Sequence, residues 1–326
     1  MKKFLEKSLL KDKTLEYFHL AKLLMKKLLP VLLLGIIAVP SKAQSFIQTY
    51  QERVNLLTKD NIINHLKEFE KLGVKTTGSL ENENAFKWIK DKYVSFGYTE
   101  DQFEEDPFSY GRIKSKNLII TKKGTKYPDK YVIICGHFDS LNGPGVNDNG
   151  SGTSIMLEAA KILKDIPTEY SIKFIHFSGE EQGLIGSKHY VNDVLYKEKM
   201  PQYEIKMVFN LDQVGGKKGM FNDTVFCDED QDGSSKNNAA STQITKELMT
   251  CTTLYSPLQA KVDPAEHSDY ISFEKKGLVI TGFFEYLRSE LPHTEDDTFA
   301  NTDVMYVYNI GKATIGALQH FAVAQQ

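Results

Sequence analysis

The chain has 326 residues, a formal net charge of −3, 41% hydrophobic residues and 25% charged residues. These proportions are ordinary for a soluble globular protein, and the length suits one large domain or two small ones. The sequence has no basic run of the kind that binds nucleic acid, so we expect no nucleic-acid partner.

The N-terminal segment has the pattern of a secretory signal peptide. Two lysines at 26–27 precede an apolar run over residues 28–39, and the small residues Ser41 and Ala43 follow it. The run is too short for an ordinary membrane span, and no cysteine lies nearby to carry a lipid anchor. We therefore predict cleavage after Ala43 and export, with an uncleaved membrane anchor as the alternative.

This prediction divides the chain into three parts. Residues 25–43 are the signal peptide, and residues 44–326 are the mature protein, secreted or periplasmic. Residues 1–24 are an additional extension, either because translation starts at Met25 or because the segment before the apolar run is unusually long. Beyond Ala43 the chain carries 31 basic and 40 acidic residues, a formal charge of about −9. Such a charge disfavours anionic membranes as partners, so we expect no stable membrane partner after cleavage.

The sequence contains three cysteines. Cys135 ends an apolar run and is expected to be a buried thiol. Cys227 and Cys251 could form a disulfide in an oxidising compartment or stay free, because sequence alone does not test the geometry of a pair.

The predicted elements begin with two helices, over residues 45–71 and 81–96, where apolar residues recur three or four apart. Strands follow over residues 101–109, 117–121 and 131–135. From there helices and strands alternate: helix 153–164, strand 171–177, helix 186–194, strand 205–211, helix 236–249, strand 253–258, helix 268–273, strand 278–284 and helix 303–322. This alternation predicts a single α/β domain with helices on both faces of a central sheet.

The central runs 131–135 and 173–177 are mostly apolar, which is typical of strands buried on both faces. By contrast, residues 227–238 are acidic and polar, and we predict a surface loop there. This loop lacks the glutamate at the twelfth position that a calcium-binding loop requires.

Five short stretches carry acidic residues and histidines that suit a metal site. They are His137-Phe-Asp139, Asp148 in Gly-Val-Asn-Asp-Asn-Gly, Glu180-Glu181, Asp212 in Asn-Leu-Asp-Gln-Val-Gly, and His293 in Pro-His-Thr-Glu-Asp-Asp-Thr. Three of them directly follow predicted strands, and ligands of open α/β sheets bind outside the carboxyl ends of the strands. Each stretch alone also has an ordinary explanation, such as a turn residue, a helix cap or a solvated side chain.

The residue types suggest a role for most of these positions. Residues two apart on a strand share a face, so His137 is expected to bind metal while Asp139 accepts the hydrogen bond of its other ring nitrogen. Asp148 lies in a glycine-rich turn where a carboxylate can bridge two cations. Adjacent carboxylates after a buried strand, as at Glu180 and Glu181, require positive charge nearby.

Together the stretches supply enough ligands for two zinc ions, and one further carboxylate remains to act as a base. One ion would take His137 and Asp212, the other Glu181 and His293, with Asp148 between them. Glu180 would act as the general base in a hydrolysis.

These motifs resemble those of the M28 family of zinc peptidases, which includes secreted bacterial aminopeptidases. The similarity covers about residues 117–302, and the block Ser-Gly-Glu-Glu-Gln-Gly at 178–183 is its most specific part. The resemblance implies a di-zinc exopeptidase that acts on peptides, a mixed and mostly parallel central sheet, and the same ligand roles.

One stretch departs from the family pattern. Family members often have Ser-Asp-His after the fourth ligand, whereas here Tyr270 follows Asp269, and His267 precedes Ser268. We expect the candidate substrate pocket near His267, Asp269 and Tyr270, although Asp269 could instead cap a helix. Arg288 is a further candidate for this pocket.

Three alternatives remain at this level. Glutaminyl cyclases resemble the family but rearrange an N-terminal glutamine. A carboxypeptidase or dipeptidase would need a cation, such as Arg288, for the substrate carboxylate. A binding domain without activity would be expected to have lost ligands, whereas all of them are present in this sequence.

Overall fold

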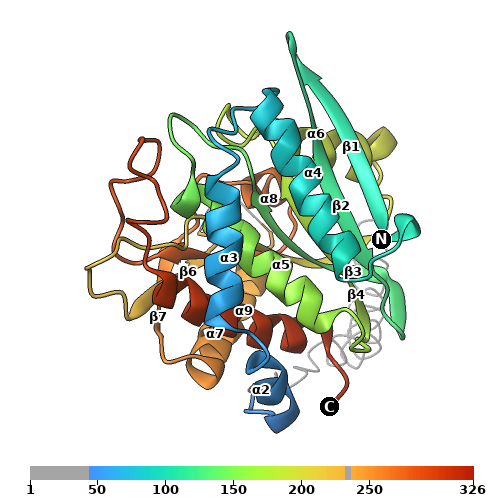
Figure 1. Cartoon of the computed structure of the whole chain (residues 1–326). Coiled ribbons are helices and arrows are strands. Elements are labelled where there is room, and N and C mark those ends of the chain that lie inside the picture. The colour runs from blue at the N-terminus through green and yellow to red at the C-terminus, as the bar shows by residue number, and fades with distance from the viewer. Residues whose placement is uncertain (1–43, 232–235) are drawn as a thin grey trace, which may run out of the picture. The chain divides into compact units, whose positions relative to one another are not determined.

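An eight-stranded sheet with the order β1-β2-β4-β3-β5-β8-β6-β7 forms the centre of the domain (Figure 1). The computed structural model describes residues 44–231 and 236–326. The predicted signal peptide and extension therefore lie outside the described residues. The strands are β1 (Phe103–Tyr110), β2 (Ile113–Lys122), β3 (Tyr127–His137), β4 (Tyr170–Phe177), β5 (Glu204–Leu211), β6 (Thr224–Glu229), β7 (Gln259–Pro264) and β8 (Ile280–Glu285).

The middle of the sheet is parallel. Strand β3 pairs in parallel with β4 and β5, and β5 pairs in parallel with β8. Antiparallel pairs occur towards the edges, between β1 and β2, β2 and β4, and β6 and β8. The prediction of a mixed, mostly parallel sheet is confirmed.

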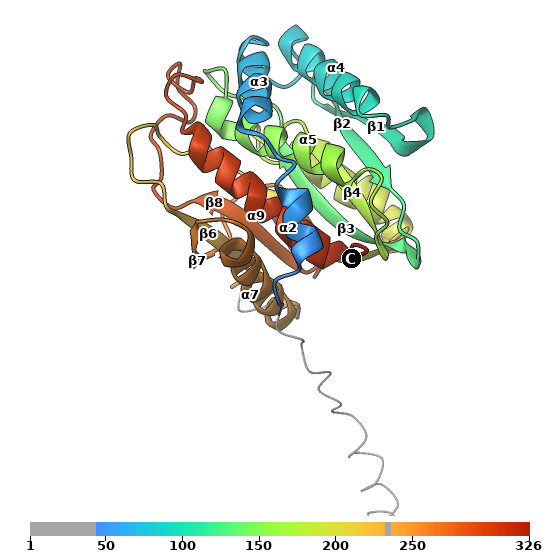
Figure 2. The same ribbon diagram turned by 60° about the horizontal axis from the view of Figure 1, so that its bottom comes forward.

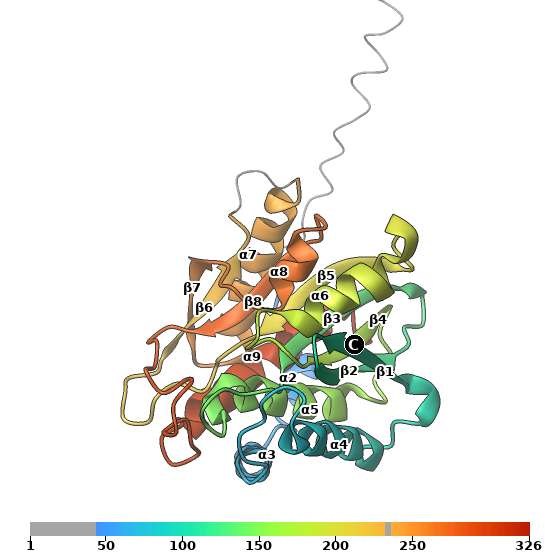
Figure 3. The same ribbon diagram turned by 90° about the horizontal axis from the view of Figure 1, so that it is seen from above.

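Helices cover both faces of this sheet. They are α2 (Gln48–Val54), α3 (Lys59–Glu70), α4 (Leu80–Ser95), α5 (Gly152–Leu163), α6 (Ile185–His189), α7 (Asn238–Tyr255), α8 (Tyr270–Glu274) and α9 (Val304–Ala322). Helices α6 and α8 cover one face and the other six cover the opposite face (Figure 2, Figure 3). Among the described residues, no helix is long and apolar enough to cross a membrane.

Alternation along β3 explains why residues 132–135 are all apolar. Val132 and Ile134 belong to the larger core cluster, whereas Ile133 and Cys135 belong to the smaller cluster on the other face. Helices cover both faces of the sheet, so the side chains on both faces are buried. A polar side chain there would lose its hydrogen bonds to water, which costs free energy unless it finds a partner.

Two predicted elements were wrong. The predicted helix over residues 45–71 is two helices, α2 and α3. Thr58 is the N-cap of α3, because its hydroxyl accepts a hydrogen bond from the backbone N–H of Asn61 at 3.2 Å. Of the predicted strand over residues 253–258, residues 253–255 instead end α7, residues 256–258 form a connection, and β7 starts at Gln259. Tyr255 packs against Gly316 of α9, where a Cβ would lie 2.4 Å from the tyrosine ring. This packing overrides the strand propensity of the threonines before Tyr255.

The predicted loop over residues 227–238 was wrong at its start, and residues 232–235 lie outside the described residues. Its first residues belong to β6, which lies between β8 and β7 and buries Cys227. Cys135, Cys227 and Cys251 are all buried free thiols, so the suggested disulfide is not present.

Candidate metal centre

The carboxyl ends of four adjacent strands bring the predicted site residues together. His137 ends β3, Glu180 and Glu181 follow β4, Asp212 follows β5, and His293 lies in the loop after β8. Asp148 comes from the turn that precedes α5. Parallel strands end at the same edge of the sheet, which is why segments far apart in sequence meet here.

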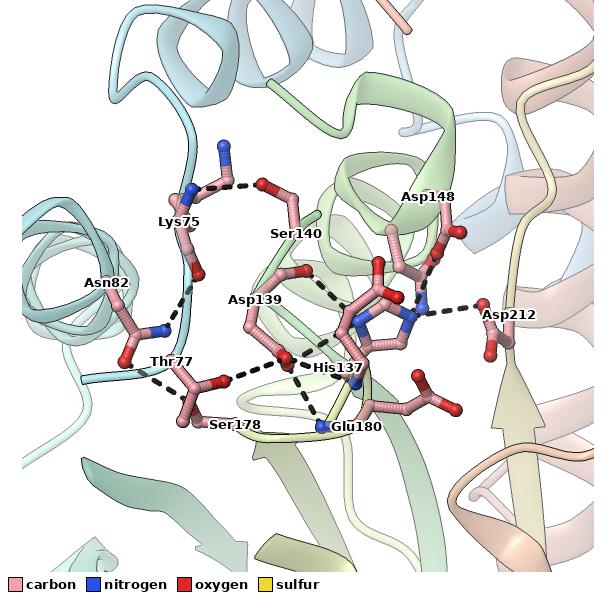
Figure 4. Close-up of polar contacts among 12 residues, drawn as sticks. Lys75, Thr77, Asn82, His137, Asp139, Ser140, Asp148, Ser178, Glu180 and Asp212 are labelled. Carbon is pink, nitrogen blue, oxygen red and sulfur yellow. Dashed lines mark hydrogen bonds and ion pairs between the residues drawn. The ribbon is translucent and has the colours of Figure 1, made fainter. Parts of the chain in front are cut away.

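Asp148 lies between two histidines. Its Oδ1 is 3.0 Å from Nε2 of His137, and its Oδ2 is 3.2 Å from Nε2 of His293. Asp212 Oδ1 lies 3.3 Å from the same nitrogen of His137, and Glu181 Oε2 lies 2.9 Å from the same nitrogen of His293. The two oxygens of Asp148 therefore divide the cluster into halves, each with one histidine and one further carboxylate. Figure 4 shows the half with His137 and Asp212.

The hydrogen bond of the second ring nitrogen fixes the orientation of His137. Its Nδ1 lies 3.1 Å from the backbone carbonyl oxygen of Asp139 and 3.6 Å from the Asp139 carboxylate. The predicted partner residue is thus present, but its backbone rather than its carboxylate accepts the hydrogen bond. With Nδ1–H donating to this carbonyl, Nε2 faces Asp148 and Asp212 and is the ring nitrogen left for a metal.

The carboxylate of Asp139 holds the glutamate doublet instead. It accepts the backbone N–H groups of Glu180 at 3.3 Å and Glu181 at 3.2 Å, and the hydroxyl of Thr77 at 3.0 Å (Figure 4). Within the described residues no hydrogen bond engages the carboxylate of Glu180, which extends towards His137 and Asp212 (Figure 4). The Glu180 backbone is therefore fixed while its carboxylate stays free.

A buried lysine supports the same region. Lys75 is fully buried, and its Nζ donates to the carbonyl oxygens of Gly73 at 2.7 Å and Pro144 at 2.5 Å. Its backbone N–H donates to the Ser140 hydroxyl at 3.0 Å. These bonds fix the segment that leads from β3 to Asp148, and sequence reasoning missed both Lys75 and Thr77.

Two more buried carboxylates hold the turn that carries Asp148. Asp297 accepts the backbone N–H groups of Asn147 at 2.6 Å and Asp148 at 3.0 Å. Glu285 accepts the side chain of Asn147 at 2.9 Å and the N–H of Gly216 at 2.8 Å. Burial raises the pKa of Asp297 to about 6 and that of Glu285 to about 7. The position of Asp297 in the motif after His293 was the only sequence signal for this role.

The cluster has more carboxylates than cations. Burial and the neighbouring Asp148 raise the pKa of Glu181 to about 8, and burial with nearby carboxylates raises the pKa of Glu180 well above its usual range. Burial also opposes ionisation of Asp148, but the two histidines outweigh it and lower its pKa. The hydrogen bond to Asp148 raises the pKa of His293 to about 9.

These properties fit a divalent cation. The ligand atoms of His137, Asp148 and Glu181 all lie within 4.8 Å of one another. Glu181 Oε1 is buried and has no hydrogen-bond partner among the described residues. Positive charge would supply that partner and replace the protons that the carboxylates otherwise retain. A donor set of histidines and carboxylates suits zinc.

A cavity of about 390 Å³ opens beside the cluster. Apart from the site residues, it is lined by Gly183, Gln213, Glu266, His267, Ser268 and Phe284. His267 thus lies where the sequence placed it. Ser268 was missed, although its hydroxyl donates to Asp212 Oδ2 at 2.5 Å and so orients that carboxylate.

The other three candidates for the pocket do not line this cavity. Tyr270 is buried and its hydroxyl donates to Asp228 at 3.0 Å. Asp269 is also fully buried, and its side chain does not cap α8 by a hydrogen bond. Burial raises the pKa of Asp269 to about 7. Arg288 lies outside the cavity and pairs with Asp263 and Glu266.

Solved structures share this fold. An aminopeptidase from Aneurinibacillus sp. strain AM-1 has a TM-score of 0.72 at 18% identity, over 85% of this chain and 96% of that one. A glutaminyl cyclase from Macrostomum lignano has a TM-score of 0.74 at 17% identity, over 87% and 96% of the two chains. At these identities the likeness shows the fold alone.

Sequence comparison is more specific. Aminopeptidase YwaD of Bacillus subtilis is 49% identical over 104 residues, which are 31% of this chain and 22% of the Bacillus protein. The chain spans less than a third of the length of this relative and of a Pseudomonas aeruginosa aminopeptidase. The model of peptidase family M28 matches residues 117–317, well over half of the chain and the part that carries every predicted ligand. By this match the protein belongs to peptidase family M28.

Proposed function

We propose that this protein is an exported aminopeptidase that binds two zinc ions and removes N-terminal residues from peptides. The observation that carries the proposal is the position of Asp148, whose two oxygens face His137 and His293 separately. Each half of the cluster then has the histidine and carboxylates of one zinc site. The names of the relatives, aminopeptidases of Bacillus and Pseudomonas, support the same activity.

Zinc, when bound, supplies a Lewis acid that polarises the scissile carbonyl and lowers the pKa of water. The remaining steps belong to side chains of the chain. Glu180 lies at the edge of the cavity with a free carboxylate, and it would accept the proton of the attacking water and pass it to the leaving amine. Asp139 holds the backbone of Glu180 for this transfer. His137, Asp148, Glu181, Asp212 and His293 would hold the two ions.

The charge of the cavity favours the amino end of a substrate over the carboxyl end. Glu180 and Glu266 line it outside the proposed zinc ligands, and no lysine or arginine does so among the described residues. Arg288, one cation that a carboxypeptidase could use, does not line the cavity. A substrate ammonium group would therefore be attracted, whereas a substrate carboxylate would be repelled.

Hydrolysis assays on the zinc-loaded protein test this proposal. We expect cleavage of leucine p-nitroanilide, loss of cleavage when the amino group is acetylated, and two zinc atoms per chain by elemental analysis. Cleavage of the acetylated compound would contradict an aminopeptidase. Cyclisation of N-terminal glutamine without hydrolysis would show a glutaminyl cyclase instead. Absence of zinc after purification without chelator, together with inactivity, would favour a binding domain.

Export is proposed from the signal-peptide pattern of residues 25–43. N-terminal sequencing of the protein collected from the periplasm or medium tests it. We expect a mature chain that starts at Gln44. A mature start before residue 40 would contradict cleavage after Ala43.

A further inference from the structure

One part of the cavity wall combines an aromatic ring with a carboxylate. Phe284 and Glu266 both line this wall, and they come from β8 and from the loop that follows β7. The side chain of Glu266 is 29% exposed, so part of it is open to solvent. An apolar surface that ends in a carboxylate matches a long side chain with an apolar stem and a cationic end.

Arg288 shows that this pair of residues binds a guanidinium group. Its NH2 contacts the Glu266 carboxylate, and its Cζ lies 5.1 Å from the centroid of the Phe284 ring. A cation over an aromatic face and beside a carboxylate is held by both. Arg288 does not line the cavity, so it contacts Glu266 and Phe284 from outside the cavity.

We propose that the cavity selects a basic N-terminal residue, arginine or lysine, whose cationic end pairs with Glu266 beside Phe284. This inference deepens the proposed aminopeptidase function and rests on it. The same carboxylate would repel an acidic N-terminal side chain.

The pair between Arg288 and Glu266 can yield to a substrate. The Arg288 side chain is 53% exposed, and exposed ion pairs contribute little to stability. Arg288 also has a second partner, Asp263 at 3.2 Å, which would keep its charge compensated after Glu266 turns to the substrate. Arg288 is therefore a competitor for Glu266, and its removal should favour basic substrates.

A comparison of arginine and citrulline substrates isolates the charge, because citrulline has nearly the same shape as arginine and is neutral. We would measure kcat/KM for the aminomethylcoumarin amides of both residues, and of glutamate, with the zinc-loaded protein. We expect arginine to exceed citrulline by about tenfold, the ratio that about 1.4 kcal/mol produces. In Glu266→Gln this ratio should fall to about one, and in Arg288→Met it should rise above the wild-type value.

Glu290→Gln provides the matched control. Glu290 carries the same charge on the loop before His293, pairs with Lys217 and does not line the cavity. Its loss should leave the arginine-to-citrulline ratio within about twofold of wild type, because exposed charges at a distance are screened.

Other outcomes would overturn the proposal. An unchanged arginine-to-citrulline ratio in Glu266→Gln would show that Glu266 does not recognise the charge of the substrate's N-terminal side chain. An equal loss on all substrates would show that it binds the amino group they share. A lower arginine-to-citrulline ratio in Arg288→Met would show that Arg288 assists the recognition of basic substrates and does not compete with them. If no variant cleaves any substrate, the aminopeptidase function fails, and calorimetric binding of argininamide against citrullinamide then decides the side-chain preference independently.

Discussion

The hydroxyl of Thr77 donates a 3.0 Å hydrogen bond to the carboxylate of Asp139, the residue that also holds the glutamate doublet. Thr77 lies before residue 117, where the family match begins. The catalytic side of the site therefore depends on a segment that the family motifs do not include.

This bond predicts the effect of changing Thr77. Thr77→Val keeps the shape but removes the donor, so the Asp139 carboxylate loses one of its three hydrogen bonds and the doublet loses alignment. We expect activity or zinc affinity to fall by roughly 10–100-fold, as for other groups that orient metal ligands. Thr77→Ser, which retains the hydroxyl, should restore most of the loss. Equal activity in Thr77→Val and wild type would contradict this role.

Glu180→Gln separates proton transfer from metal binding. The substitution removes the base but leaves the proposed ligands, so zinc content should stay at the wild-type value while kcat falls by about 10²–10⁴-fold. Elemental analysis and steady-state kinetics on the same preparation measure both quantities. Activity near wild type would refute the assignment of Glu180 as the base.

Asp148→Ala tests the bridging position. Because its two oxygens face the two histidines separately, its removal should weaken both zinc sites rather than one. Elemental analysis after dialysis should find less than one zinc per chain. Asp296→Asn, at an exposed acid close to His293, is the control and should retain the wild-type content. Two retained zinc ions in Asp148→Ala would exclude bridging.

Zinc binding should compete with protons. In the metal-free protein the pKa of Glu181 is about 8 and that of His293 about 9, so both are largely protonated at pH 7. Metal ligands must lose these protons. Apparent zinc affinity should therefore rise with pH between about 6 and 9 and then level off, and calorimetry in buffers of different ionisation enthalpy should detect proton release at pH 7. A pH-independent affinity would contradict these shifts.

Lys75 should make stability depend on pH in the alkaline range. Burial lowers its pKa to about 7, whereas the unfolded chain keeps this proton up to roughly pH 10.4. Between these values the unfolded state binds more protons, so the free energy of unfolding contributed by Lys75 rises with pH. Lys75→Met should remove this slope. Urea unfolding of both proteins at several pH values between 7 and 10 measures it, and parallel curves would contradict the prediction.

Local patterns determined much of the fold. The predicted strands 131–135 and 171–177 lie within β3 and β4, because strands covered on both faces are rich in apolar residues. Local patterns failed where packing decided the outcome. Residues 253–255 have strand propensity but complete α7, since Tyr255 packs onto α9.

The sequence by itself determined the types and order of the residues at the metal centre, because the chemistry of zinc hydrolysis limits which side chains can serve. Only the tertiary structure decided how they are held. Thr77 and Asp139 are 62 residues apart, and Asn147 and Asp297 are 150 apart. No local pattern encodes such pairs, since they form only when the strand ends and loops come together at one edge of the sheet. The same holds for Glu266 and Arg288, which meet beside Phe284.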